Sequence, residues 1–407
     1  MLNSYQAAID WLFKQFPSYQ NIGASAYKPG LERVEHLLAE LGNPHQELKI
    51  VHVAGTNGKG STSSYMATYL TEKSEKVGLF TSPHIFDFRE RIRVDGEKIS
   101  EEFVLEFCNR IQNLNLEIEP SFFEITFAMA VSYFNSENCS FCVLETGMGG
   151  RLDATNIVNP LVSVITNIGF DHTQFLGNTY SEIAFEKAGI IKKNTPVVIG
   201  ETNSETKTVF LNTAKSHNAE IIFAEDEALP EISNLSLYQL KNLRTAIKVL
   251  DICGFAIENS LLEKSLKNLH VNTGFFGRLT VISQHPRIIL DVSHNLEGIK
   301  ATLESIMLPA TGKLYILYGA SADKNVEEII SQFPNDAIIH LCKFTNERSL
   351  SFQQLELIMN KDERIRKVYE NVNEAIAEIQ SKMTENDSLL VTGSFFLLAN
   401  VEKNKFQ

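Results

Sequence analysis

The chain of 407 residues is longer than one hydrophobic core normally organises, so we expect two domains. Its 43% hydrophobic and 21% charged residues are typical of a soluble globular protein. The formal net charge of −13 repels nucleic acids and anionic membranes at long range, so the composition argues against both as partners.

The N-terminal stretch from Met1 to Phe13 mixes charged and apolar residues and lacks a basic start. This pattern predicts an amphipathic helix rather than a secretion signal. The apolar runs are all shorter than a membrane span, so we expect a cytoplasmic protein.

Short apolar runs alternate with amphipathic stretches through the first part of the chain. This alternation predicts an α/β fold, with a mostly parallel sheet flanked by helices on both faces. We expect strands at 48–54, 77–81, 141–146, 161–166 and 196–200, and a helix from Ser61 to about Leu70.

Glycines interrupt the pattern at 273–278, and a new series of apolar runs follows. We expect strands there at 287–291, 313–319, 337–341 and 388–392. The sequence therefore predicts a P-loop domain at 1–273, a linker, and a smaller C-terminal α/β domain of the Rossmann-like type at 278–407. A cleft between two domains would be the natural place for a site.

The predicted strand at 48–54 runs into a glycine-rich turn that has the residues of a phosphate cradle. The turn consists of Gly55, Thr56, Asn57, Gly58, Lys59, Gly60 and Ser61. Backbone N–H groups and a helix N-terminus would bind an anion, Lys59 would reach the β- and γ-phosphates, and Ser61 or Thr62 would offer a hydroxyl to Mg²⁺. Val53 and Gly60 depart from the usual P-loop pattern, and the alternative is a turn whose glycines serve only backbone geometry.

Other chemically distinctive residues follow later strands of the first domain, where parallel sheets collect their ligands. Glu145 suits Mg²⁺, although a carboxylate that caps the next loop is the alternative. Arg151 and Asp153 could orient a substrate carboxylate and amine, or form a structural ion pair. Taken alone, His172 is more often structural than a ligand, and Lys187 is a routine helix-surface lysine.

Two further groups leave alternatives open. In the second domain Asp291 could accept hydrogen bonds from ribose hydroxyls and His294 could reach phosphate or base, although both residue types are also common in turns. The five cysteines, an odd number, argue against a disulfide framework. Cys139 and Cys142 have redox or zinc spacing, but their place in a buried strand favours packing.

Together these segments resemble the folylpolyglutamate synthase/dihydrofolate synthase family of the Mur ligase superfamily over essentially the full length. The matching segments, in family order and spacing, lie at 55–61, 81–84, 90–92, 122–124, 145–156, 171–173, 186–190, 277–278 and 291–295. The resemblance implies an ATP-dependent amide ligase that acts through an acyl phosphate. It would join L-glutamate to dihydropteroate and extend the γ-glutamyl chain of reduced folates.

The resemblance also implies a role for each matching residue. The glycine turn and Lys59 would bind ATP, together with Arg278, Asp291 and His294 of the C-terminal domain. Two Mg²⁺ ions would be held by Ser61, Ser82, Glu145 and His172, and Lys187 matches a lysine that is carbamylated in the superfamily. The acceptor would contact His84, Arg91, Phe122 and Phe123, with Arg151 and Asp153 as further substrate contacts. We expect a monomer whose partners are the small-molecule substrates: dihydropteroate or a reduced folate, L-glutamate and ATP.

Two alternatives to this interpretation are a cell-wall type ligase with another carboxylate acceptor and a P-loop protein that uses nucleotide as a conformational switch. Gly60 after Lys59, the Ser-Pro-His loop at 82–84 and the Phe-Phe-Glu segment at 122–124 resemble the folate branch. A switch would leave the residues of the second domain without a role. Val292, Ser293 and Leu296 depart from the family motif, but Asp291 and its functional neighbours are retained.

Overall fold

The computed structural model describes residues 1–16, 28–114, 116, 119–308 and 311–402. Its contacts divide the chain into two compact units, residues 1–275 and 276–407, which we describe separately. The division falls within the glycine-containing stretch where the linker was predicted, while the domain limits of 1–273 and 278–407 stay a prediction.

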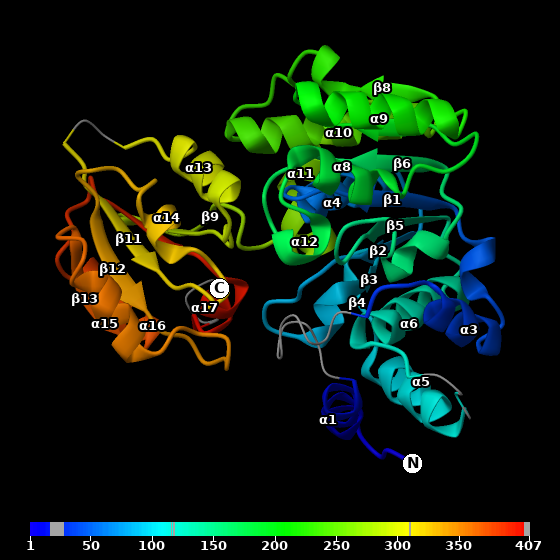
Figure 1. Ribbon diagram of the computed structural model, residues 1–407, viewed down its shortest axis with the longest axis horizontal. Helices are drawn as coiled ribbons and strands as arrows, with labels where there is room; N and C mark the ends of the chain where they lie inside the picture. Colours follow the sequence, from blue (N-terminus) through cyan, green and yellow to red (C-terminus); the bar gives the residue numbers. More distant parts are fainter. Residues whose placement is uncertain (17–27, 115, 117–118, 309–310, 403–407) are drawn as a thin grey trace. The chain divides into compact units, whose positions relative to one another are not determined.

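Unit 1 contains an eight-stranded sheet that is parallel except at one edge, where β3 and β4 run antiparallel (Figure 1). The predicted strands are all present, and the short edge strands were not predicted. In spatial order the strands are β4 (Glu97–Lys98), β3 (Ile92–Val94), β2 (Val77–Phe80), β5 (Phe141–Glu145), β1 (Ile50–Ala54), β6 (Val162–Ile165), β7 (Val197–Ile199) and β8 (Ile221–Phe223).

Helices cover both faces of this sheet, as the continuous apolar strands predict. Side chains of one strand alternate between the faces, so Ile50 and Ala54 pack with one set of helices and Val51 and Val53 with the other. The first set is α1 (Tyr5–Gln15), α3 (Glu32–Glu40), α5 (Glu101–Asn113), α6 (Phe122–Ser136), α8 (Tyr180–Ala188) and α9 (Ser204–Ser216). The second is α4 (Lys59–Glu72), α10 (Leu237–Ile252), α11 (Asn259–Lys267) and α12 (Leu269–Thr273).

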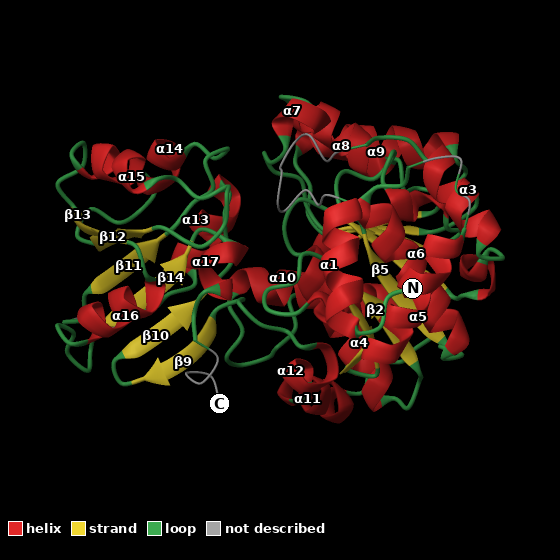
Figure 2. Ribbon diagram, turned by 90° about the horizontal axis from the view of Figure 1, so that it is seen from below, coloured by secondary structure: helices red, strands yellow, loops and turns green. Residues whose placement is uncertain are grey.

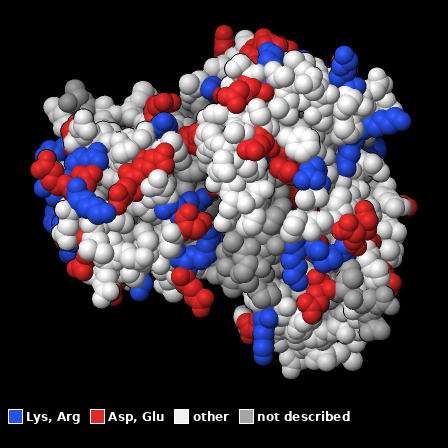
Figure 3. Space-filling model, viewed as in Figure 1, with Lys and Arg blue, Asp and Glu red and all other residues white. Residues whose placement is uncertain are grey.

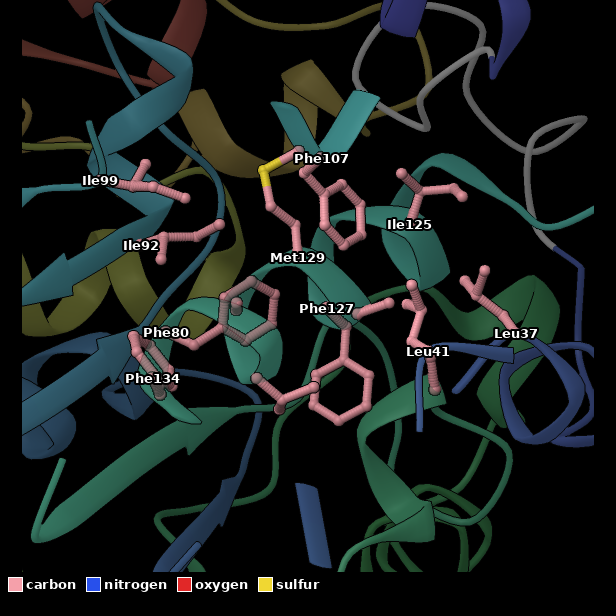
Figure 4. Close-up of a cluster of buried hydrophobic side chains, with 14 of the residues drawn as sticks. Leu37, Leu41, Phe80, Ile92, Ile99, Phe107, Ile125, Phe127, Met129 and Phe134 are labelled. Atoms are coloured by element: carbon pink, nitrogen blue, oxygen red, sulfur yellow. The ribbon is translucent and has the colours of Figure 1, made fainter. Parts of the chain in front are cut away.

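The core on the first face is rich in aromatic rings (Figure 4). Phe80 of β2 packs against Phe123 and Phe127 of α6, with ring centroids 5.6 and 6.0 Å apart. Helix α6 is apolar nearly all round because it is buried between the sheet and other helices, and its Phe127 and Phe134 have no exposed surface. The N-terminus of α6 is therefore held firmly where Phe122 and Phe123 begin it.

Unit 2 is a second α/β layer structure with a six-stranded sheet (Figure 2). In spatial order its strands are β13 (Ile365–Tyr369), β12 (Ile338–Cys342), β11 (Leu314–Tyr318), β14 (Ser388–Thr392), β10 (Arg287–Leu290) and β9 (Thr280–Gln284), of which only β9 is antiparallel to its neighbour among the described strands. Helices α13 (Leu296–Glu304), α14 (Val326–Ile330) and α15 (Phe352–Met359) pack on one face, and α16 (Val372–Gln380) lies on the other. The short helix α17 (Phe395–Ala399) follows β14.

The predicted fold class is confirmed, because both units have mostly parallel sheets with helices on both sides. Among the described residues, we find no helix whose length and apolar character would let it cross a membrane. On the face that Figure 3 shows, Lys and Arg side chains lie interspersed with Asp and Glu.

Candidate functional site

The glycine turn joins β1 to α4, and neighbouring residues hold it in place. Thr56 N–H donates to Asn167 O at 2.9 Å, and Asn57 N–H donates to Asn167 Oδ1 at 2.9 Å. The Thr166 hydroxyl donates to Asn57 O at 2.6 Å. Thr166 and Asn167 belong to the loop directly after β6. This loop therefore positions the glycine turn, which follows the neighbouring strand β1.

Two of the glycines are required by geometry. Gly55 and Gly58 have φ values of +151° and +80°, in the region that favours glycine. A Cβ at Gly55 would lie 1.9 Å from Thr166 Oγ1, and one at Gly58 would lie 2.3 Å from Asn242 Oδ1. The turn therefore brings backbone N–H groups to the N-terminus of α4, a helix of 14 residues, where they have no intrahelical acceptor.

Lys59 lies between the turn and the predicted metal ligand. Its ammonium group donates to Gly55 O at 3.0 Å and to Thr56 O at 3.3 Å. The same nitrogen lies 3.9 Å from Glu145 Oε1. The positive charge predicted to meet phosphates is thus held beside the carboxylate predicted to hold a metal.

Glu145 ends β5 and is buried, with 4% of its surface exposed. Its Oε2 accepts a hydrogen bond from Ser82 N–H at 3.0 Å, and a Cβ on Gly60 would lie 3.5 Å from the same oxygen. The structure therefore brings together Lys59, Gly60, Ser82 and Glu145, which lie at or soon after the carboxyl ends of three neighbouring strands, β1, β2 and β5. The carboxylate of Glu145 supplies the kind of oxygen ligand that Mg²⁺ prefers, and Ser82 lies beside it, so these residues fit the ion.

His172 lies at the N-terminus of the short helix α7 (Thr173–Leu176), after β6. Its backbone φ of +51° is unusual for a non-glycine residue, and its N–H donates to Asp171 Oδ1 at 2.9 Å. The same loop is attached to the glycine turn, because Gly169 N–H donates to Thr56 Oγ1 at 2.9 Å. Among the described residues no group of three or more His, Cys, Asp and Glu side chains is arranged as a metal site, and the predicted set includes only two such residues.

Lys187 is not the exposed helix lysine that its position alone suggested. It is buried on α8, and its Nζ donates to Gly55 O at 2.9 Å. Burial, followed by the charge of Lys59, lowers the pKa of Lys187 to about 7, while Asp171 and Asp153 act in the opposite direction. At neutral pH a large fraction of this amine is therefore unprotonated and nucleophilic.

The predicted acceptor residues form an aromatic cluster around a buried arginine. Arg91 Nε donates to His84 Nδ1 at 2.8 Å, and the guanidinium lies 5.4 Å from the centroid of the Phe122 ring. Burial lowers the pKa of Arg91 to about 10, with Glu145 and Glu90 opposing the shift. Burial, followed by the charge of Arg91, also places the pKa of His84 well below its ordinary value of 6.5. His84 is therefore neutral at physiological pH.

Phe13, which was not predicted as a site residue, belongs to this cluster. Its ring stacks on Phe122 with centroids 5.0 Å apart and an angle of 20° between the planes. Phe123 lies next to the cluster, and its ring borders Gly147, where a Cβ would come within 2.7 Å. The only signal for Phe13 was its place in the predicted amphipathic helix, and long-range contacts of this kind leave no local pattern.

Arg151 and Asp153 do not pair with each other, so the prediction of a structural ion pair between them is wrong. Arg151 Nη2 lies 2.8 Å from Glu186 Oε1. Asp153 is buried and accepts hydrogen bonds from the Thr155 hydroxyl at 2.5 Å and from Met148 N–H at 2.8 Å. Their roles as substrate contacts stay a prediction, and the visible partners of Asp153 belong to its own loop.

In unit 2, the three predicted nucleotide contacts surround the junction of β10 and α13. The Asp291 carboxylate accepts hydrogen bonds from Leu279 N–H at 2.9 Å, ahead of β9, from Ser293 N–H at 2.8 Å in its own turn, and from the Thr302 hydroxyl of α13 at 3.1 Å. The Arg278 guanidinium lies 5.4 Å from the centroid of the Phe395 ring, and the His294 ring lies 5.7 Å from it. Phe395 therefore links two predicted residues and was itself missed.

The cysteine pair fits the packing interpretation. Cys142 is fully buried in β5, Cys139 is half-buried, and neither forms a disulfide. Burial raises the pKa of the Cys142 thiol well above its ordinary value, and a hydrogen bond with Cys139 adds to this effect. A buried thiol of raised pKa is a poor nucleophile and a poor metal ligand.

Comparison with known proteins places these features in a family context. Residues 53–281 match the Mur ligase middle domain, and residues 277–395 match the Mur ligase, glutamate ligase domain. The dihydrofolate synthase/folylpolyglutamate synthase of Bacillus subtilis (strain 168) is 33% identical over 99% of this chain and 99% of its own.

Solved structures give the same result. Escherichia coli FolC in complex with DHPP and ADP has a TM-score of 0.84 and 25% identity, covering 98% of this chain and 96% of its own. The bifunctional folylpolyglutamate synthase/dihydrofolate synthase of Yersinia pestis, complexed with AMPPNP and a Mn ion, has a TM-score of 0.83 and 26% identity, covering 98% and 97%. The resemblance found in the sequence is confirmed.

Proposed function

The chain belongs to the Mur ligases and, within them, to the dihydrofolate synthase/folylpolyglutamate synthase family, and on this basis we propose an ATP-dependent glutamate ligase. The enzyme joins L-glutamate to dihydropteroate and to the γ-carboxylate of reduced folates. The observation that carries the proposal is the junction of Lys59, Ser82 and Glu145 beside the glycine turn. This junction supports the proposal because ligands of parallel sheets collect at the carboxyl ends of neighbouring strands, where an anion site and a metal site would then adjoin.

The reaction needs an activated carboxylate, because a carboxylate is a poor electrophile towards an amine. An acceptor oxygen attacks the γ-phosphorus of ATP, ADP leaves, and an acyl phosphate results. The glutamate amine then attacks the acyl carbon, phosphate leaves, and the amine loses a proton as the amide forms. Charge neutralisation and alignment supply the catalysis, so no protein nucleophile is required.

Residues at different positions in the fold bind the phosphates, the metal ions, the acceptor and the nucleotide. The N–H groups at the start of α4 and the ammonium group of Lys59 bind the phosphates and offset their charge. Ser61, Ser82, Glu145 and His172 hold two Mg²⁺ ions, which neutralise phosphate charge when bound. His84, Arg91, Phe122 and Phe123 bind the acceptor, with Arg151 and Asp153 as further substrate contacts. Arg278, Asp291 and His294 bind nucleotide from the C-terminal domain, residues 278–407, while domain 1–273 provides the other groups.

Lys187 is carbamylated in this proposal. Its buried amine, with the pKa lowered to about 7, is an effective nucleophile towards dissolved CO₂ at neutral pH. Carbamylation of Lys187 replaces a cation beside Gly55 O with an anion that assists the metal site. A protein equilibrated with ¹³C-bicarbonate should show a carbamate carbonyl resonance in ¹³C NMR spectra, and this resonance should be missing from Lys187→Met.

The activity is tested directly by incubating the purified protein with MgATP and L-glutamate. Dihydropteroate and tetrahydrofolate are offered separately, and phosphate release and product mass are followed. We expect glutamate-dependent phosphate release with both acceptors and products heavier by one glutamate residue or more. Release with only one acceptor restricts the activity, and release with neither contradicts the proposal. We further propose a cytoplasmic monomer, which sedimentation of the same preparation tests for oligomeric state.

A further inference from the structure

His52 is a polar residue in a fully buried strand of the P-loop sheet, and the proposed mechanism gives it no role. It lies in β1 between Val51 and Val53, and it has no exposed surface. Burial lowers the pKa of its imidazole to about 3, so the ring is neutral at physiological pH. Its Nε2 lies 2.7 Å from Thr155 Oγ1, whereas Nδ1 has no hydrogen-bond partner among the described residues.

The hydrogen bond between His52 and Thr155 has a defined direction. The Thr155 hydroxyl donates its only proton to Asp153 Oδ1 at 2.5 Å, and Thr155 N–H donates to the same oxygen at 3.1 Å. The hydroxyl oxygen must therefore accept from His52, which requires the Nε2–H tautomer. His52, Thr155 and Asp153 thus form one chain of hydrogen bonds that ends on a carboxylate.

That carboxylate holds the glycine turn that follows Glu145. Asp153 Oδ2 accepts from Met148 N–H at 2.8 Å, and Asp153 N–H donates to Gly150 O at 3.1 Å. Gly147 borders the ring of Phe123 so closely that a Cβ would come within 2.7 Å of it. A displacement of Asp153 would therefore move the turn at 147–150 against an acceptor residue.

A packing role alone does not account for a histidine here. An unsatisfied buried nitrogen such as Nδ1 carries a desolvation penalty, and leucine would fill much of the volume without that penalty. The benefit of histidine must come from the Nε2–H donor, since this is the group with a partner.

We propose that His52 is a positioning residue for acceptor binding: acting through Thr155 and Asp153, it holds the turn at 147–150 against Phe123. This inference rests on the proposed function, because Phe123 is an acceptor contact only in that function. It predicts an effect on acceptor binding and none on the phosphate-binding turn, which other residues hold.

The first test compares two substitutions that separate hydrogen bonding from packing. His52→Gln places an amide N–H donor near the position of Nε2, and His52→Leu keeps the volume without a donor. We expect His52→Leu to raise the KM for dihydropteroate or tetrahydrofolate about tenfold, with kcat and the KM for ATP changed less than twofold. His52→Gln should stay within about threefold of the wild type for all three constants.

Ser163→Ala is the matched control. Ser163 is the register neighbour of His52 in β6 and is equally buried, but its hydroxyl donates to Ile190 O at 2.7 Å and not to the chain. It should lower the unfolding midpoint without changing the KM for the acceptor. The proposal would be overturned if His52→Leu and His52→Gln had equal KM values for the acceptor. It would also be overturned if His52→Leu raised the KM for ATP as much as the KM for the acceptor.

A second readout does not depend on turnover. In ¹⁵N NMR spectra of histidine-labelled protein, the His52 signal, assigned by its loss in His52→Gln, should show the Nε2–H tautomer from pH 5 to 8. Thr155→Val should abolish this preference, and an Nδ1–H tautomer in the wild type would refute the chain. Failure of the proposed function is recognised separately, because wild-type protein would then release no acceptor-dependent phosphate.

Discussion

The carbonyl oxygen of Gly55 accepts hydrogen bonds from two lysines, and this arrangement explains the electrostatics of the site. Lys59 Nζ lies 3.0 Å from it and Lys187 Nζ lies 2.9 Å from it. Burial lowers the pKa of Lys187, and repulsion between the two ammonium groups on one oxygen lowers it as well, to about 7 in total. The nucleophilic, unprotonated form of the Lys187 amine is thus favoured both by burial and by the charge of Lys59.

The lowered pKa of Lys187 predicts how stability depends on pH. Between pH 7 and 10.5, the unfolded chain binds a proton that the native Lys187 does not, so the free energy of unfolding rises with pH across this window. The slope is at most about 1.4 kcal/mol per pH unit. In CO₂-free buffer, urea unfolding of the wild type should therefore gain stability relative to Lys187→Met as the pH rises from 7 to 9.5. The exposed neighbour substitution Lys193→Met is the control, and parallel curves for wild type and Lys187→Met would contradict the assignment.

Lys59 offers a prediction for turnover at the same scale. Lys59→Met removes the charge that faces the phosphates, and we expect kcat to fall at least about 100-fold, as for other groups that stabilise developing charge. Lys73, at the other end of the same helix and partly exposed, provides the control Lys73→Met, which should keep full activity. Matching circular dichroism spectra show that the fold is intact, and a near-normal rate for Lys59→Met would refute its role.

At the scale of elements, the strand-end loops were predictable because apolar runs mark buried strands. The predicted strands at 48–54 and 141–146 appear as β1 and β5, and the residues after them meet beside α4. The short antiparallel strands β3 and β4 were not predicted, since they contain only three and two residues and carry charged side chains.

The partners of individual residues were less predictable. Arg151 pairs with Glu186 and His52 with Thr155, and these pairs depend on which loops the sheet order brings together. Sequence spacing gives no access to that order, because β1 lies between β5 and β6 rather than beside β2. The residue types of the site were therefore predictable, while the residues with which they form hydrogen bonds and ion pairs were not.

The glycine turn gives a prediction at this scale. Gly58→Ala introduces strain at a φ of +80° and also a clash, since the new Cβ would lie 2.3 Å from Asn242 Oδ1. Gly254→Ala is a matched control with a φ of +87° and nothing within 4 Å of its Cβ. We expect Gly254→Ala to cost about 1 kcal/mol of stability with normal nucleotide affinity. Gly58→Ala should lose more stability and at least about tenfold in affinity for ATP, measured by denaturant unfolding and calorimetry. Equal losses for both variants would show that the turn is less constrained than its contacts indicate.

For the whole molecule, the net charge of −13 sets a condition on anion binding. An acidic protein repels ATP and folates at long range, so the cations that bind them must act locally. Arg91 is buried and Lys59 has only 17% of its side chain exposed, which keeps these charges little screened by salt.

The proposed use of both domains predicts how nucleotide binding alters the whole chain. If Arg278, Asp291 and His294 bind ATP together with the glycine turn, MgATP analogue should slow hydrogen exchange in peptides covering 55–62 and also in those covering 278–296. Saturation at about 100 times Kd should raise the free energy of unfolding by about 2.7 kcal/mol. The control is Asp291→Asn, which should reduce protection in 278–296 and leave that at 55–62 in place. Protection confined to 55–62 in the wild type would show that nucleotide binds through the first domain alone and would remove the C-terminal residues from the proposed site.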